Sequence, residues 1–65
     1  MQNPIRRLRI KIGITQKELA EYLGLRKNAV SNWEVGCRYP RRPFRQKLLI
    51  LARKYNMEDE ILRYL

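Results

Sequence analysis

One predicted helical face carries mostly polar side chains. Its polar residues are Lys27, Asn28, Ser31 and Asn32, and Val35 is its apolar member. At about 100° per residue these four positions cluster on one side of a helix, opposite the apolar residues of the same segment. Their ammonium, amide and hydroxyl groups donate or accept hydrogen bonds. The pattern favours a surface that recognises a partner by hydrogen bonding.

Residue types that usually carry catalysis or bind metal are scarce. The chain has no histidine, and Cys37 is its only cysteine, so neither a Cys/His zinc site nor an internal disulfide can form. We also find no paired base and nucleophile and no glycine-rich phosphate loop. The sequence therefore predicts a protein that is not an enzyme and needs no metal or cofactor.

The charge is strongly basic and unevenly distributed. Fifteen Lys and Arg residues oppose six Asp and Glu residues, which gives a formal net charge of +9. Three of the acids, Glu58, Asp59 and Glu60, lie together near the C-terminus. A basic surface attracts polyanions, of which nucleic acid is the commonest. The alternative is a small protein whose charge serves only solubility.

The length of 65 residues predicts a single domain, residues 1–65. A chain this short buries little surface, so compact helix packing or a partner subunit must supply its stability. No apolar run approaches the roughly 20 residues that a membrane span needs. A lone free cysteine fits a reducing compartment, and we expect a cytoplasmic location.

Two helices are predicted in the N-terminal third of the chain. Asn3 and Pro4 suit the N-cap and first position of a helix that Gly13 ends. Thr15 and Glu18 then have the spacing of a capping box, in which each side chain bonds the other residue's backbone amide. A second helix should therefore begin directly after Thr15.

The rest of the chain also has a helical pattern. A third helix is predicted over about residues 27–35, and an Arg-rich loop, "CRYPRRPFRQK", leads into a fourth helix with Pro43 at its first position. Asn56 can end that helix, and the acidic run at 58–60 favours the start of a short fifth helix. Because no strand pattern occurs, we predict an all-α, compact bundle of four to five short helices.

The second and third helices have the spacing of a helix-turn-helix. With Gln16 as the first position, Ala20 is fifth, Gly24 ninth, Val30 fifteenth and Trp33 eighteenth. A small fifth residue allows close helix crossing, glycine at the ninth permits a positive φ, and the two later apolar residues anchor the third helix. Such a unit presents its second helix at the surface, where it fits the major groove of DNA.

The segments "TQKELAEYLGL" and "AVSNWEVG" resemble the Cro/repressor-type (XRE-like, lambda-repressor-like) helix-turn-helix proteins of bacteria, phages and plasmids. The resemblance extends from about Ile5 to Leu62. Two features depart from the family pattern. The loop after Gly36 is longer and richer in arginine, and Arg26 occupies a position where the family usually has a Ser or Thr N-cap.

The resemblance implies a role for individual residues. Gln16 is expected to bind a DNA phosphate at the start of the second helix. The family's base-reading positions correspond to Lys27, Asn28, Ser31 and Asn32. Asn can bond adenine in a bidentate way and Lys can donate to guanine. Further phosphate contacts are expected from Arg26, Arg38, Arg41 and Arg42.

In the same family, residues at the positions of Arg9 and Glu34 often pair between the first and third helices. Such a pair would orient the recognition helix rather than contact DNA. Its energetic value depends on burial, because a truly buried pair costs about 3 kcal/mol when one partner is removed and an exposed pair under about 1 kcal/mol.

The resemblance thus implies a sequence-specific regulator of transcription that binds double-stranded DNA, most often a repressor. The family usually binds as a homodimer on a near-palindromic operator. A dimer contact could use five apolar residues near the C-terminus: Leu49, Ile50, Ile61, Tyr64 and Leu65. For Ile61 and Leu65 a second interpretation, closure of the monomer core, remains open. The alternative function is an antitoxin-type or other module of this fold that binds a protein partner.

Overall fold

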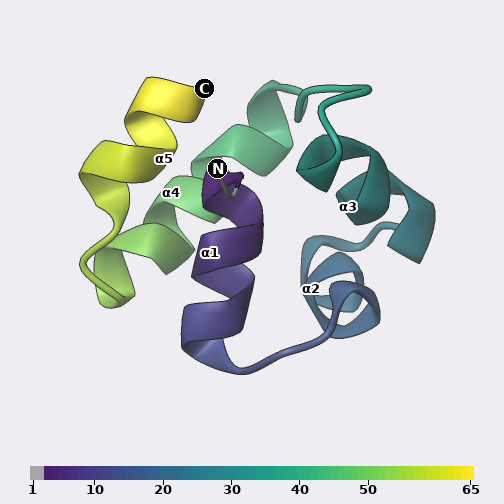
Figure 1. Cartoon of the computed structure of the whole chain (residues 1–65), viewed down its shortest axis with the longest axis horizontal. Helices are drawn as coiled ribbons and strands as arrows, with labels where there is room; N and C mark the ends of the chain where they lie inside the picture. Colours follow the sequence, from purple (N-terminus) through teal and green to yellow (C-terminus); the bar gives the residue numbers. More distant parts are fainter. Residues whose placement is uncertain (1–2) are drawn as a thin grey trace.

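The computed structural model describes residues 3–65, and residues 1 and 2 of the predicted domain lie outside this part. Within residues 3–65 the chain forms helices only, with no strand. The helices are α1 (Pro4–Ile12), α2 (Gln16–Leu23), α3 (Lys27–Glu34), α4 (Arg42–Lys54) and α5 (Glu58–Tyr64). In Figure 1, α1 lies between the α2–α3 pair and the α4–α5 pair. The predicted all-α bundle of short helices is therefore confirmed.

The caps of α1 and α2 agree with the sequence pattern. The Asn3 side chain accepts a hydrogen bond from the Ile5 amide at 2.8 Å, and Gly13 ends α1 with a left-handed φ of 86°. At α2 the Glu18 amide donates to the Thr15 hydroxyl at 3.1 Å, and the Thr15 amide donates to the Glu18 carboxylate at 2.9 Å. These bonds satisfy amides that a helix leaves without an internal partner.

The ends of α3 and α4 differ slightly from expectation. The α3 helix ends at Glu34, and Val35 forms its C-cap, one residue before the left-handed Gly36. The α4 helix begins at Arg42 rather than at Pro43. Proline is tolerated anywhere in a first turn, because the amide that it lacks has no partner there, so the pattern fixes this start only to within a residue. Arg26 caps α3 without a side-chain bond.

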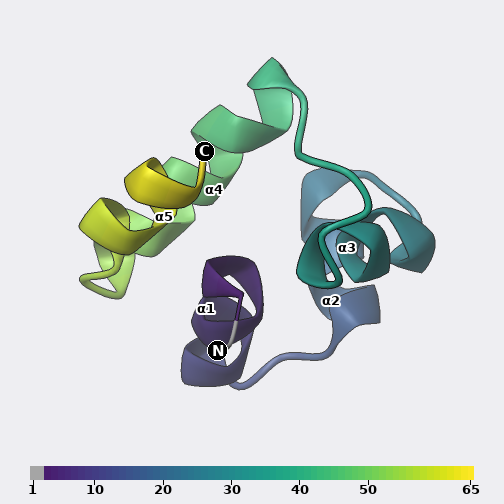
Figure 2. The same ribbon diagram turned by 45° about the horizontal axis from the view of Figure 1, so that its top comes forward.

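All five helices contribute to one core. Its members are Ile5, Leu8, Leu19, Ala20, Leu23, Val30, Trp33, Leu48, Leu51, Ala52, Met57 and Ile61. The small side chain of Ala20 is fully covered where α2 packs against α3, as the expected close crossing requires. The two helices are in contact, and Figure 2 shows α3 in front of α2. The core thus holds α3 from one side and leaves its other side at the surface.

The C-terminal helix closes the core and is tied to its neighbours by ion pairs. Arg7 Nη1 of α1 lies 2.8 Å from Glu60 Oε2, and Arg53 Nε of α4 lies 2.6 Å from Glu58 Oε2. Ile61 is fully buried. The interpretation of Ile61 as a dimer contact is therefore wrong, because its side chain has no surface left to offer.

The other candidate interface residues differ in exposure. Leu49, Tyr64 and Leu65 are half-buried and pack against the core. Ile50 of α4 and Leu62 of α5 are each 52% exposed. Of the apolar residues considered for a dimer contact, Ile50 therefore keeps the most accessible surface, and Leu62, which the sequence did not suggest for this role, is equally exposed.

Candidate nucleic-acid interface

The polar face of α3 lies at the surface of the molecule. Lys27 and Asn28 are exposed, and Ser31 and Asn32 are half-buried. Val35, directly after the helix, continues this face and is 69% exposed. Four side chains with hydrogen-bonding groups and one apolar side chain are thus available to a partner along one short helix.

Apolar packing fixes the opposite face of α3. Val30 is completely buried, and Trp33 is 4% exposed. The Trp33 ring lies 6.3 Å from the Phe44 ring, centroid to centroid, which places α4 against the last turn of α3. Trp33 is therefore a core residue, and it is not a platform on which a base could stack.

A partly buried polar network holds the last turn of α3 against α1 and α2. Arg9 Nε donates to Glu34 Oε2 at 2.7 Å, and Arg9 Nη2 donates to Glu34 Oε1 at 3.2 Å. The side chains of Arg9 and Glu34 are only 16% and 4% exposed. The hydrogen bond that Arg9 donates to Glu34 raises the pKa of Arg9 above its ordinary value, although burial acts in the opposite direction. Arg9 also donates to the Ile14 carbonyl at 3.1 Å, which fixes the loop before α2.

Gln16 belongs to the same network. Its side-chain amide nitrogen donates to Glu34 Oε1 at 3.2 Å. The residue that the sequence assigns to a phosphate contact is thus held in place by the ion pair. The family resemblance implies that Arg9 and Glu34 pair, but it does not imply that Gln16 joins them. Spacing along the chain does not show which side chains meet.

A second set of bonds converges on the carbonyl oxygen of Trp33. Asn3 Nδ2 donates to it at 3.0 Å, the Tyr64 hydroxyl at 3.1 Å and the Gly36 amide at 3.2 Å. Carbonyls in the last turn of a helix lack an internal partner, so these donors act as a cap. The sequence does not indicate these roles of Asn3 and Tyr64, because both lie about thirty positions from Trp33 and no local pattern links them.

A shallow hollow of about 660 Å³ lies at the N-terminus of α2. Gln16, Lys17 and Lys27 are among the residues that line it. The backbone amides at a helix N-terminus and two ammonium groups make this a favourable place for an anion. Lys17 was not among the predicted phosphate contacts, although its position directly after Gln16 could have suggested it. Lys27 borders this hollow as well as the polar face.

The Arg-rich loop between α3 and α4 is anchored at both ends. The amides of Cys37 and Arg38 donate to the Asn32 carbonyl at 2.9 and 3.3 Å, and Pro40 is buried. The Tyr39 ring lies 5.4 Å from the Tyr64 ring of α5, centroid to centroid. Backbone and ring contacts, rather than the arginine side chains, therefore set the course of this loop.

The predicted phosphate-binding arginines fall into two groups. All four are exposed: Arg26, Arg38, Arg41 and Arg42. Arg38 and Arg41 line a common cavity beside Trp33, whereas Arg26 and Arg42 do not. The acids Glu34, Glu58 and Glu60 are paired with arginines of α1 and α4, so they do not neutralise the loop.

Residues 3–65 hold neither a metal-ligand cluster nor a membrane-spanning helix. This part of the chain has no cluster of His, Cys, Asp and Glu that could hold a metal ion. None of its helices is long and apolar enough to cross a membrane.

Comparison with known families supports the geometry. A helix-turn-helix family model matches residues 5–62, which includes all of α2 and α3. Comparisons of the chain with curated proteins and with solved structures find no significant match. The matched region agrees with the "TQKELAEYLGL" and "AVSNWEVG" segments and with the packing of α3 on α2. The chain belongs to the helix-turn-helix family of DNA-binding proteins, in its Cro/repressor-type branch.

Proposed function

We propose that the protein is a transcriptional repressor that binds a specific sequence in double-stranded DNA. In this proposal α3 enters the major groove and covers promoter DNA. One observation carries it: in a chain of this family, the hydrogen-bonding face of α3 is exposed while its other face is fixed by the core and by the Arg9–Glu34 pair. A rigidly held polar helix is what direct reading of base edges needs.

The side chains divide into two roles. Asn28, Ser31 and Asn32 read bases from the polar face. Lys27 lies between the polar face of α3 and the hollow at the start of α2, and it reaches either a base or a phosphate. The anchors are Gln16, Arg26, Arg38, Arg41 and Arg42, to which we add Lys17 because it shares the hollow at the start of α2. Anchors set position and affinity, and readers set sequence choice.

The binding unit is a homodimer on a near-palindromic operator. Two copies of α3 then reach half-sites one helical turn apart. Ile50 and Leu62 support this assembly, because each is an apolar side chain half-exposed on the two C-terminal helices. A repressor of this type acts in the cytoplasm of a prokaryotic cell, on chromosomal, phage or plasmid DNA.

Selection of bound sequences from random duplex DNA at fixed salt tests the proposal. We expect an enriched motif with two related half-sites. The Asn28→Ala variant should enrich a motif that has lost information at one position of each half-site. Recovery of random sequence by the native protein would contradict specific binding, and a motif without internal symmetry would contradict the dimer.

The second candidate is a module that binds a protein partner, as antitoxin-type proteins of this fold do. The exposed side chains of Ile50 and Leu62 favour it as much as they favour a homodimer. A pull-down that recovers one partner in stoichiometric amount, lost in the Leu62→Glu variant, would support this candidate.

A further inference from the structure

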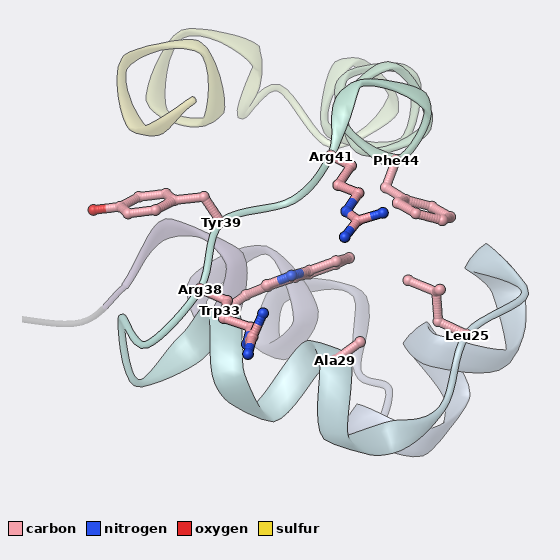
Figure 3. A pocket seen from close by; sticks show the side chains of 7 residues that line it. All are labelled: Leu25, Ala29, Trp33, Arg38, Tyr39, Arg41 and Phe44. Atoms are coloured by element: carbon pink, nitrogen blue, oxygen red, sulfur yellow. The ribbon is translucent and has the colours of Figure 1, made fainter.

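A cavity of about 550 Å³ lies between α3, the Arg-rich loop and the start of α4. Its apolar walls come from Leu25, Ala29, Trp33 and Phe44. Figure 3 shows the indole ring of Trp33 crossing the cavity, with Phe44 and Leu25 at one end. Leu25, Ala29 and Phe44 are only half-buried, so apolar surface is left uncovered here. A volume of this size lies within the range of small-molecule sites.

Two arginines complete the cavity. Arg38 and Arg41 line it, and the guanidinium group of Arg41 projects toward the Trp33 ring in Figure 3, whereas Tyr39 points away from it. No acidic residue is among the residues that line the cavity. A guanidinium group recognises a carboxylate through paired hydrogen bonds and also packs on an aromatic face. These walls are complementary to a molecule that is apolar at one end and anionic at the other.

We propose that this cavity is an effector site for a small aromatic carboxylate. The ring of the ligand lies against the half-buried side chains of Leu25, Ala29 and Phe44, beside the small exposed part of the Trp33 ring. Its carboxylate pairs with Arg38 and Arg41. A DNA phosphate is a poorer match, because it would use the arginines and leave the apolar walls in contact with water.

The site also suggests how the ligand would act, and this part rests on the proposed function. Arg38 and Arg41 are anchors for DNA phosphates in that proposal, so a carboxylate paired with them competes with DNA. Ligand and DNA then lower each other's affinity by the same factor, as linkage requires. The ligand is thus an inducer that releases the repressor from its operator.

Binding can be measured on the free protein by NMR. Trp33 is the only tryptophan, so its indole N–H signal reports directly on the cavity. We would titrate benzoate, 3-phenylpropionate and indole-3-acetate, and compare each with its neutral amide. At least one carboxylate should shift the Trp33 signal with a Kd of about 1 mM or below and bind about tenfold more tightly than its amide.

Matched variants separate the cavity from general charge. Arg41→Gln and Arg38→Gln should each weaken the carboxylate about tenfold, because each removes a charge-assisted hydrogen bond. Arg45→Gln, an exposed arginine of α4 outside the cavity, should leave the affinity unchanged. Ala29→Leu fills the cavity and should abolish binding, and its unfolding transition shows whether the variant is folded.

The outcomes are distinct. The site is refuted if no carboxylate shifts the Trp33 signal, if amides bind as tightly as carboxylates, or if Arg45→Gln weakens binding as much as Arg41→Gln. Binding that leaves operator affinity unchanged would refute the inducer role alone. A protein that binds the carboxylate but no DNA at all would refute the proposed function and keep the site.

Discussion

Arg9 and Glu34 join the first helix to the recognition helix through two hydrogen bonds, the shorter of which is 2.7 Å from Arg9 Nε to Glu34 Oε2. The Glu34 side chain is only 4% exposed and that of Arg9 16%, and Gln16 of α2 donates to the same carboxylate. Three helices therefore meet at one charged group at the end of α3. This pair controls the position of α3 without being exposed on its polar face.

Replacement of Arg9 by Met should destabilise the fold by about 3 kcal/mol, because the buried Glu34 carboxylate would lose its counter-charge. Urea denaturation followed by circular dichroism measures this loss. The double variant Arg9→Met with Glu34→Met should recover part of it, since no buried charge is then left unpaired. A double variant as unstable as Arg9→Met would contradict this explanation.

A matched control lies between α4 and α5. Arg53 and Glu58 approach more closely, at 2.6 Å, but the Arg53 side chain is 70% exposed. Arg53→Met should therefore cost less than about 1 kcal/mol, because water screens an exposed pair. Equal losses in Arg9→Met and Arg53→Met would show that distance, rather than burial, determines the energy.

Tyr64→Phe tests the cap on the Trp33 carbonyl. The variant removes the hydroxyl that donates to this oxygen but keeps the ring beside Tyr39. We expect a loss of about 0.5–1.5 kcal/mol in the free energy of unfolding. Tyr22→Phe, at an exposed position on α2, is the control and should change stability by less than about 0.5 kcal/mol. A stability of Tyr64→Phe equal to that of the control would mean that the bond contributes nothing.

The turn between α2 and α3 can be tested at Gly24. Its φ is 76°, and no atom lies within 4 Å of the position that a Cβ would take. Gly24→Ala should therefore cost about 1–2 kcal/mol through backbone strain alone. Gly24→Asn should cost less, because Asn tolerates the left-handed conformation. If Ala and Asn gave the same unfolding midpoint, crowding rather than φ would be the cause.

Local chemistry made most of the fold predictable. The Asn3 cap, the Thr15–Glu18 capping box and the glycines after α1 and α2 act within a few residues, so the sequence displays them directly. Their positions predict where α1 and α2 begin and end. The small residue Ala20 predicts the close contact of α2 with α3. The start of α4 was less certain, because Pro43 is compatible with more than one position in a first turn.

Long-range contacts could not be predicted in the same way. Nothing near Tyr64 in the sequence indicates that its hydroxyl reaches the Trp33 carbonyl, and nothing near Arg38 indicates a cavity. The role of Ile61 could not be predicted for a different reason. A short amphipathic helix has the same sequence pattern whether its apolar face packs on the core or on a second subunit. Only the arrangement in space distinguishes these cases.

The proposed dimer can be tested at Leu62. Leu62→Glu adds a charge to a half-exposed position on α5, so the monomer should fold while self-association is lost. Analytical ultracentrifugation with and without operator DNA measures the change. Ile10→Glu, at a position 50% exposed on α1, is the matched control and should leave the assembly intact. A dimer that survives Leu62→Glu must use another surface.

The division between readers and anchors makes the most specific prediction. Asn28→Ala and Asn32→Ala should each cost about 1–3 kcal/mol on the preferred sequence for a lost bidentate contact, and little on unrelated DNA. Arg42→Ala should weaken binding to every sequence by a similar factor and reduce the salt dependence by about one counterion. Fluorescence anisotropy on matched and scrambled duplexes at several salt concentrations separates the two patterns. If Asn28→Ala and Arg42→Ala changed affinity, specificity and salt dependence alike, the exposed face of α3 would be a general phosphate-binding surface rather than a reader of bases.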